Sequence, residues 1–140
     1  MLVSLTRLHI RSVWFLPRFL WLNERAVRQI ISSPGFREGR LLGERDLSFW
    51  TATLWDDEAS MRGFRDSGAH RQVMPRLVHW CDEASVAKWH DRDTLPSWQE
   101  TYERMKAHGR ASKVRHPSPR HATLDFPAPR SRASRPLKPK

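Results

Sequence analysis

The strand pattern at residues 47–55 constrains the fold most, because bulky side chains stand on both of its alternating faces. Successive side chains of a β-strand point to opposite sides of the sheet. One face carries Trp50, Ala52 and Leu54, and the other carries Phe49, Thr51, Thr53 and Trp55. Strands of this kind are covered on both sides. Because one layer of helices covers only one face, we expect a homodimer whose sheets pair and supply the second cover.

Strand and helix patterns alternate around this segment. Further strand patterns occupy residues 1–10, 36–43 and 83–90. Helical spacing of apolar residues follows at 16–31, after the capping Asp56 or Asp57 with a break at Gly68, and after Pro96. This β-α-β-β-α-β order with one extra helix predicts an α+β fold. The protomer would be ferredoxin-like, with two helices on one face of a four-stranded antiparallel sheet.

The positive charge is concentrated at the C-terminus. The formal net charge is +10, and residues 110–140 hold nine Lys or Arg against one acid, whereas residues 1–109 hold 16 against 14. The final segment also carries six of the ten prolines and none of the seven tryptophans. Such a composition offers little apolar surface to offset the entropy lost on ordering. We therefore expect a folded domain over 1–109 and a basic, Pro-rich disordered tail over 110–140.

The chain shows no sequence sign of export or membrane insertion. Cys81 is the single cysteine, which excludes an internal disulfide and fits a reducing, cytoplasmic setting. The most apolar N-terminal run, residues 13–22, is interrupted by Pro17 and Arg18. It is about half the ~20 residues that a spanning helix requires. We therefore predict no membrane association.

Two motifs resemble a known family. Residues 50–55 read WTATLW and match a pattern W-T-x-[TS]-L-W, and after an acidic helix start Phe64 to His70 match F-x-x-S-G-A-H. With the opening VSLTRLHIRS and the order of elements, residues 1–105 are similar to a bacterial family of unknown function in the dimeric α+β barrel superfamily. That superfamily includes antibiotic-biosynthesis-type monooxygenases, and the motifs also resemble the spheroidene-monooxygenase group.

The resemblance implies a homodimer with a ligand pocket between each sheet and its own helices. It favours a small monooxygenase, or an oxygenase-like binding protein, that acts on a hydrophobic organic molecule. The superfamily includes cofactor-free oxygenases and haem-using members, and fold alone does not fix the chemistry. We expect no cofactor, and haem is the alternative that remains open.

His70 and Asn23 are the predicted catalytic residues. On a continuous helix His70 projects to the same side as Met74, so its imidazole would face the pocket and move a proton near neutral pH. If haem is bound, His70 is the expected metal ligand. The competing interpretation is a helix-terminal histidine bonded to a backbone carbonyl. Asn23 lies in the apolar phase of the first helix and is either a pocket amide or a residue at the edge of that stripe.

The predicted substrate contacts are Trp50, Thr51, Thr53, Trp55 and Met74. Aromatic side chains suit a hydrophobic polycyclic or isoprenoid substrate, although tryptophans are also common core residues. Trp50 and Trp55 have opposite parity, so at most one faces the helices. Strand parity does not decide which.

Other function classes lack their motifs. The sequence contains no phosphate-binding glycine loop, no G-x-S-x-G elbow, and no H-E-x-x-H or paired-cysteine metal motif. Hydrolase, nucleotide-binding and zinc-enzyme functions are therefore disfavoured. The alternative class is a non-enzymatic, nucleic-acid-associated protein that binds phosphates through its basic C-terminal tail.

Overall fold

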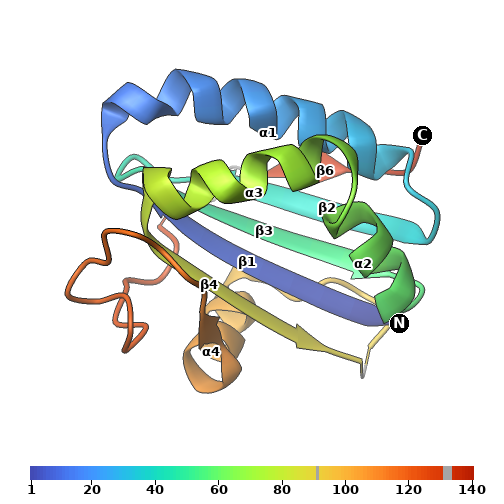
Figure 1. The fold of residues 1–140 in the computed structure, drawn as a ribbon. Coiled ribbons are helices and arrows are strands. Elements are labelled where there is room, and N and C mark those ends of the chain that lie inside the picture. The colour runs from blue at the N-terminus through green and yellow to red at the C-terminus, as the bar shows by residue number, and fades with distance from the viewer. Residues whose placement is uncertain (91, 131–133) are drawn as a thin grey trace.

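The computed structural model of the protein describes residues 1–90, 92–130 and 134–140. Within these ranges the strands form one antiparallel sheet (Figure 1). They are β1 (Leu2–Ile10), β2 (Phe36–Gly43), β3 (Ser48–Trp55), β4 (Cys81–Trp89), β5 (Arg110–Ala111) and β6 (Arg135–Leu137). The strand order is β5-β4-β1-β3-β2-β6, so the four long strands run 4-1-3-2. This arrangement confirms the predicted ferredoxin-like α+β fold.

Helices lie on both sides of the sheet. A short 3₁₀ turn, η1 (Val13–Phe15), leads into α1 (Leu16–Ile31), which lies beside α2 (Glu58–Arg65) and α3 (Gly68–Trp80) over one face. The fourth helix, α4 (Trp98–His108), lies against the opposite face (Figure 1). We call the first the helix face and the second the α4 face. No helix among the described residues is both long enough and apolar enough to cross a membrane.

Local sequence signals place the helix ends. The Asp57 side chain accepts a hydrogen bond from Ser60 N at 2.8 Å, and Ser97 caps α4 through Glu100 N at 3.1 Å. Pro17 occupies the first turn of α1, where its missing N–H costs nothing. Gly68 has a φ of +56°, a conformation that separates α2 from α3 and favours glycine.

The core of the helix face contains side chains from α1, from α2 and from those residues of β3 that point toward these helices. Trp55 packs with Val27, Ile30 and Met61, and all four are buried. The helical spacing of apolar residues over 16–31 predicts that Leu20 lies in the buried stripe together with Leu16 and Phe19. The structure corrects this, because Leu20 is 44% exposed whereas Leu22 and Ala26 are buried. Packing of α1 beside α3 fixes its rotation more closely than periodicity does.

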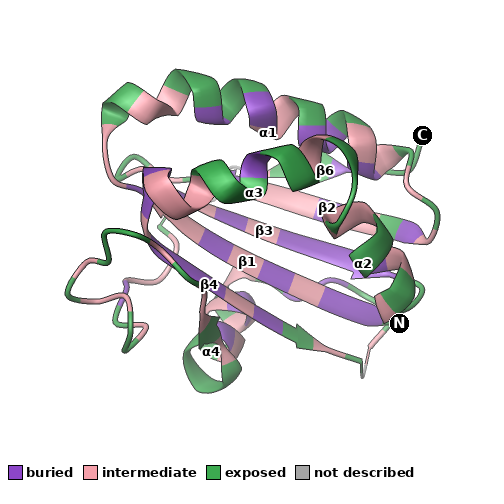
Figure 2. Cartoon of the chain, in the orientation of Figure 1, coloured by how far each residue is buried: buried purple, intermediate pink, exposed green. Residues whose placement is uncertain are grey.

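The α4 face is covered within the same chain (Figure 2). Trp50 and Leu42 are each 1% exposed, and they pack with Leu95, Met105 and Phe126 from α4 and its flanking segments. The inference that a partner sheet is needed to bury this face is therefore wrong. Apolar patterning reports that a face is buried, but it does not report which chain buries it. Homodimerisation itself stays a prediction.

The C-terminal segment contacts the body at several points. β5 pairs with β4, β6 pairs with β2, and Phe126 and Leu137 are each 4% exposed. Arg120 also forms an ion pair with Glu83 on the α4 face. The two apolar anchors were easy to overlook in a segment dominated by proline and charge. The proposed domain boundary at 109 stays a prediction, and residues 131–133 of the expected tail lie outside the described part.

Candidate functional site

A cavity of about 670 Å³ lies between the helix face of the sheet and helices α1 to α3. Its volume is within the range of small-molecule sites. Small and hydroxylated side chains of β1, β3 and β4 form its floor, because bulkier residues there would fill the space. The floor residues include Ser4, Thr6, Thr51, Thr53, Ala84 and Val86. Phe19, Val27 and Ile30 of α1 and Phe64, Val73 and Leu77 from α2 and α3 line the other side.

His70 lines this cavity from the first turn of α3. Its Nδ1 lies 3.0 Å from the carbonyl oxygen of Arg65, and its ring lies 4.7 Å from that of Phe64. Because a carbonyl only accepts, Nδ1 carries the proton and Nε2 is left as an acceptor. Burial lowers the pKa of His70 below its ordinary value of 6.5, although the bond to Arg65 opposes this. Both interpretations of this histidine hold geometrically: it is bonded to a carbonyl and it lines the cavity.

Gln29 fixes the junction that carries His70. Its Nε2 donates to the carbonyl oxygens of Phe64 at 3.0 Å and Ser67 at 2.9 Å, and its Oε1 accepts from His70 N at 2.9 Å. One amide of α1 therefore ties the end of α2 to the start of α3. Sequence reasoning missed this residue. Arg28 and Gln29 both lie between Val27 and Ile30, so the local sequence did not single out Gln29.

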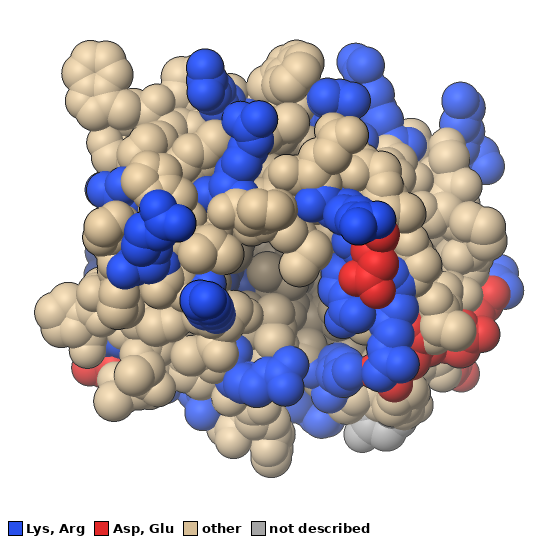
Figure 3. Space-filling model, viewed as in Figure 1, with Lys and Arg blue, Asp and Glu red and all other residues tan. Residues whose placement is uncertain are grey.

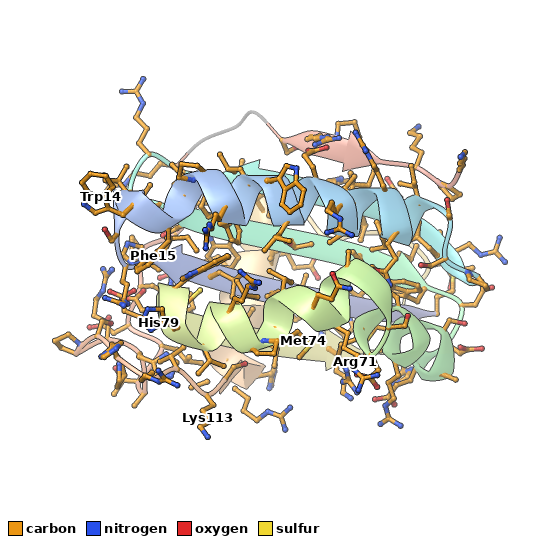
Figure 4. All side chains as sticks on the ribbon, turned by 45° about the horizontal axis from the view of Figure 1, so that its top comes forward. Trp14, Phe15, Arg71, Met74, His79 and Lys113 are labelled. Atoms are coloured by element: carbon orange, nitrogen blue, oxygen red, sulfur yellow. The ribbon has the colours of Figure 1, made fainter. Side chains whose placement is uncertain are left out.

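Asn23 and Met74 also line the cavity, from α1 and α3 respectively. Asn23 is half-buried, and among the described residues its side-chain amide has no hydrogen-bond partner. It is therefore available to a ligand. Met74 is 41% exposed on the outer side of α3 (Figure 4), so it borders the opening and not the interior.

The β3 candidates divide between the two faces of the sheet. Trp55 lines the cavity, and its Nε1 donates to Thr53 Oγ1 at 2.9 Å. That hydroxyl in turn donates to Ser4 O at 3.3 Å, which leaves Thr53 little capacity for a ligand. Thr51 also lines the cavity. Its hydroxyl has no hydrogen-bond partner among the described residues.

Trp50 lies on the α4 face and does not line this cavity. Its ring packs against Phe126 and Tyr102, with centroid separations of 5.6 and 6.4 Å. The alternation of side chains along β3 requires this, since Trp55 faces the helices. Trp50 therefore does not contact a ligand in this cavity, although it lines a separate pocket on the α4 face together with Arg7 and Ser48. Its proposed role in substrate binding stays a prediction.

Basic side chains border the cavity opening (Figure 3). Arg65, Lys88, Arg110 and Lys113 line it, and no Asp or Glu is among the lining residues that the structure describes. Sequence reasoning did not place Arg110 and Lys113 here, because both were assigned to the tail. Their position follows from the pairing of β5 with β4.

One cluster of potential metal ligands lies elsewhere. Atoms of His9, Asp82 and Glu83 are all within 4.8 Å of one another. His9 Nδ1 lies 2.6 Å from Asp82 Oδ1, and Glu83 is bonded to Arg7 and Arg120. These groups already pair with each other or with cations, so they do not form an open ligand set.

The sequence matches no protein-family model and no curated protein. Solved structures do match. An antibiotic biosynthesis monooxygenase is 16% identical with a TM-score of 0.58, over 69% of this chain and 100% of that one. SnoaB, a cofactor-independent oxygenase from Streptomyces nogalater, is 20% identical with a TM-score of 0.54, over 69% and 97%. Rv0793 from Mycobacterium tuberculosis is 10% identical with a TM-score of 0.59, over 66% and 96%.

The chain shares the ferredoxin-like α+β fold of these three proteins. Identities this low establish the fold and not the reaction. The matched share of the chain is about two thirds, so part of it lies outside the shared fold. The resemblance noted from residues 50–55 and 64–70 is thus confirmed at the level of fold.

Proposed function

We propose that the protein is a small monooxygenase that binds a hydrophobic organic molecule in the cavity between its sheet and helices. The single observation that carries the proposal is the pairing of an apolar cavity with a neutral, oriented imidazole, that of His70. SnoaB, which has a similar fold, is a cofactor-independent oxygenase. That likeness supports the choice of oxygenation over other chemistry without establishing it.

In this proposal His70 is the general base. With Nδ1–H bonded to the Arg65 carbonyl, Nε2 accepts a proton from an acidic CH₂ or hydroxyl group of the substrate. The lowered pKa keeps the imidazole unprotonated at neutral pH, which this role requires. The Asn23 amide donates a hydrogen bond to the oxygen on which the negative charge develops.

The deprotonated substrate is then the reductant for dioxygen. A CH₂ group becomes a carbonyl, one oxygen atom is retained in the product, and the other leaves as water with the two hydrogens. The substrate supplies all four electrons, so the balance needs no external reductant. The apolar lining from α1 and α3 keeps bulk water away from the anion.

Haem is the alternative cofactor. The donor set fits it, because His70 has a free Nε2 and a second nitrogen oriented by a backbone carbonyl, as is usual for metal-bound histidine. Bound haem would supply dioxygen activation at iron, and the residues around Val73 and Leu77 would contact its ring. Protein produced with iron and haem precursor tests this. A Soret band that is lost in His70→Ala would favour haem.

The cofactor-free proposal is tested by dioxygen consumption with metal-free protein and a polycyclic aromatic ketone that has an acidic ring CH₂. We expect turnover that falls at least about 100-fold in His70→Gln, the usual scale of general-base catalysis. Asn23→Ala should fall less. His90→Gln is the matched control, because His90 is exposed and outside the cavity. Equal rates in His70→Gln and the wild type would overturn the assignment of the base.

A further inference from the structure

The cavity opening is electrostatically one-sided. Four lining residues are Lys or Arg and none of the described lining residues is acidic. Two of the four are balanced by neighbours outside the lining, because Arg65 pairs with Asp66 and Lys88 pairs with Glu58. Arg110 and Lys113 have no ion-pair partner among the described residues. The uncompensated charge therefore comes from these two residues.

The segment that carries these two cations is held at the opening by the backbone. Arg110 pairs with Val86 in the β5–β4 ladder, and Ser112 N donates to Ala84 O at 2.8 Å. Three residues further on, Arg115 N donates to Val78 O at 2.8 Å, which joins the segment to α3. Residues 110–115 thus bridge β4 and α3 along one wall of the cavity.

Figures 3 and 4 agree with this placement of the basic segment. In Figure 4 Lys113 lies on the side of α3 away from α1, where the basic segment runs. In Figure 3 Lys and Arg side chains surround the hollow at the centre of the view, and acidic side chains gather toward α2.

We propose that the cavity selects an apolar organic anion: an apolar body between sheet and helices, with an acidic group bound at the opening by Arg110 and Lys113. This inference rests on the proposed function and names its substrate class. Cations without partners beside an apolar cavity attract an anion. They raise the affinity for the anion and leave that for a neutral analogue unchanged, so the cavity prefers the anion. The positive charge of the first part of the C-terminal segment then has a role in ligand selection.

The test uses two fluorescent probes that differ by one anionic group. 8-Anilinonaphthalene-1-sulfonate carries a sulfonate, and N-phenyl-1-naphthylamine has the same apolar body without it. Binding of both is measured for the full chain and for the double variant Arg110→Gln/Lys113→Gln. The control is Arg18→Gln/Lys138→Gln, which removes the same charge from exposed positions outside the cavity. Mutual displacement shows that the two probes share a site.

We expect the anionic probe to bind the Arg110/Lys113 variant roughly five- to tenfold more weakly, as two partly exposed charge interactions are lost. The neutral probe should bind both proteins equally, which also shows that the variant is folded. Higher salt should weaken only the anionic probe, and only where both cations are present. The control variant should match the wild type.

Two outcomes distinguish a failure of this inference from a failure of the proposed function. Equal binding of the anionic probe to the wild type and the Arg110/Lys113 variant would overturn the selection of anions, while binding of the neutral probe would leave the cavity as the ligand site. If neither probe bound the folded wild type, the cavity would fail as a site for apolar ligands, and the proposed function would fail with it.

Discussion

At the residue scale, His70 combines a fixed tautomer with a depressed pKa. Burial disfavours its charged form, so the folded protein binds a proton here less readily than the unfolded chain does. As pH falls through 6.5, the unfolded state takes up the proton first, and this group's contribution to stability is lost from there down to the folded pKa. The same neutral form is the one that the proposed base requires.

We therefore expect the acid limb of the pH–rate profile to lie below pH 6.5. Protonation of Nε2 removes the acceptor, so the rate should fall as pH drops through the lowered pKa. Single-turnover rates from about pH 4.5 to 8 measure the limb. His70→Gln should abolish it, and His90→Gln should leave it in place. A limb above pH 6.5 would contradict the role of burial.

A second residue-scale feature is the ion pair of Arg7 and Glu83 beneath the α4 face. The side chains are 1% and 4% exposed, with Arg7 Nη1 2.7 Å from Glu83 Oε1. The other carboxylate oxygen accepts from Ser118 Oγ at 2.7 Å and Arg120 Nε at 3.1 Å. Burial alone would raise the pKa of Glu83, but these hydrogen bonds and the charges of Arg7 and Arg120 lower it.

Removing Arg7 leaves the buried Glu83 carboxylate with Arg120, whose side chain is 41% exposed, as its remaining ion-pair partner. We expect Arg7→Met to lower the free energy of unfolding by about 3–5 kcal/mol, measured by urea denaturation. The double variant Arg7→Met/Glu83→Leu should recover most of that loss. Arg37→Gln, which breaks an exposed pair with Asp56, should change little. A double variant as unstable as Arg7→Met alone would show that the loss is one of packing.

At the element scale, the α2–α3 junction decides where His70 stands. Gly68 has a φ of +56°, and a Cβ at this position would lie 3.1 Å from the Gln29 side chain, the group that holds the junction. Both the backbone conformation and the close approach therefore favour glycine. Gly63, within α2, offers a direct comparison, because a Cβ added there would meet no other atom within 4 Å.

We expect Gly68→Ala to destabilise the protein by about 1–2 kcal/mol, the cost of a left-handed conformation for an L-residue. It should also lower activity, because Gln29 and His70 would shift together. Gly63→Ala should stabilise by about 0.5–1 kcal/mol, since alanine is the better residue in a helix interior. Thermal and urea unfolding of the two variants measure this, and effects of the same sign would contradict the structural reason.

At the scale of the whole molecule, the C-terminal segment acts as a cover as well as a source of charge. Phe126 packs with Trp50 on the α4 face, and its ring lies 4.2 Å from the guanidinium of Arg7. Sheet-to-sheet pairing of two copies would need the same face. The predicted homodimer can therefore form through its sheets only after the C-terminal segment has moved off the α4 face.

We expect a chain ending at 109 to form more dimer than the full chain, because Trp50 and Leu42 lose part of their cover. Light scattering at matched micromolar concentrations measures the masses, starting from 16.5 kDa for the full-length monomer. Phe126→Asp in the full chain should act in the same direction by expelling one anchor. If the truncated form stays monomeric and its free energy of unfolding is unchanged, the C-terminal segment does not stabilise the protein by covering the α4 face.

The sequence by itself determined the order of elements and the parity of β3. Periodicity and capping are local, so α1 was expected at residues 16–31 and is found there, and the break at Gly68 follows from one glycine. The sequence also indicated that both faces of β3 are buried, which Trp50 and Trp55 bear out at 1% exposure each. His70 was singled out because helical spacing places it on the same side as Met74.

Only the tertiary structure decided which group meets which. Strand parity is symmetric, so it could not tell that Trp55 faces the cavity and Trp50 the α4 face. His70 bonds to the Arg65 carbonyl five residues earlier, and Gln29 of another helix holds the junction between α2 and α3 through the carbonyls of Phe64 and Ser67. No local pattern encodes the contacts of Gln29. Arg110 reaches the cavity only because β5 pairs with β4. Such contacts depend on packing between distant segments, which composition and periodicity do not record.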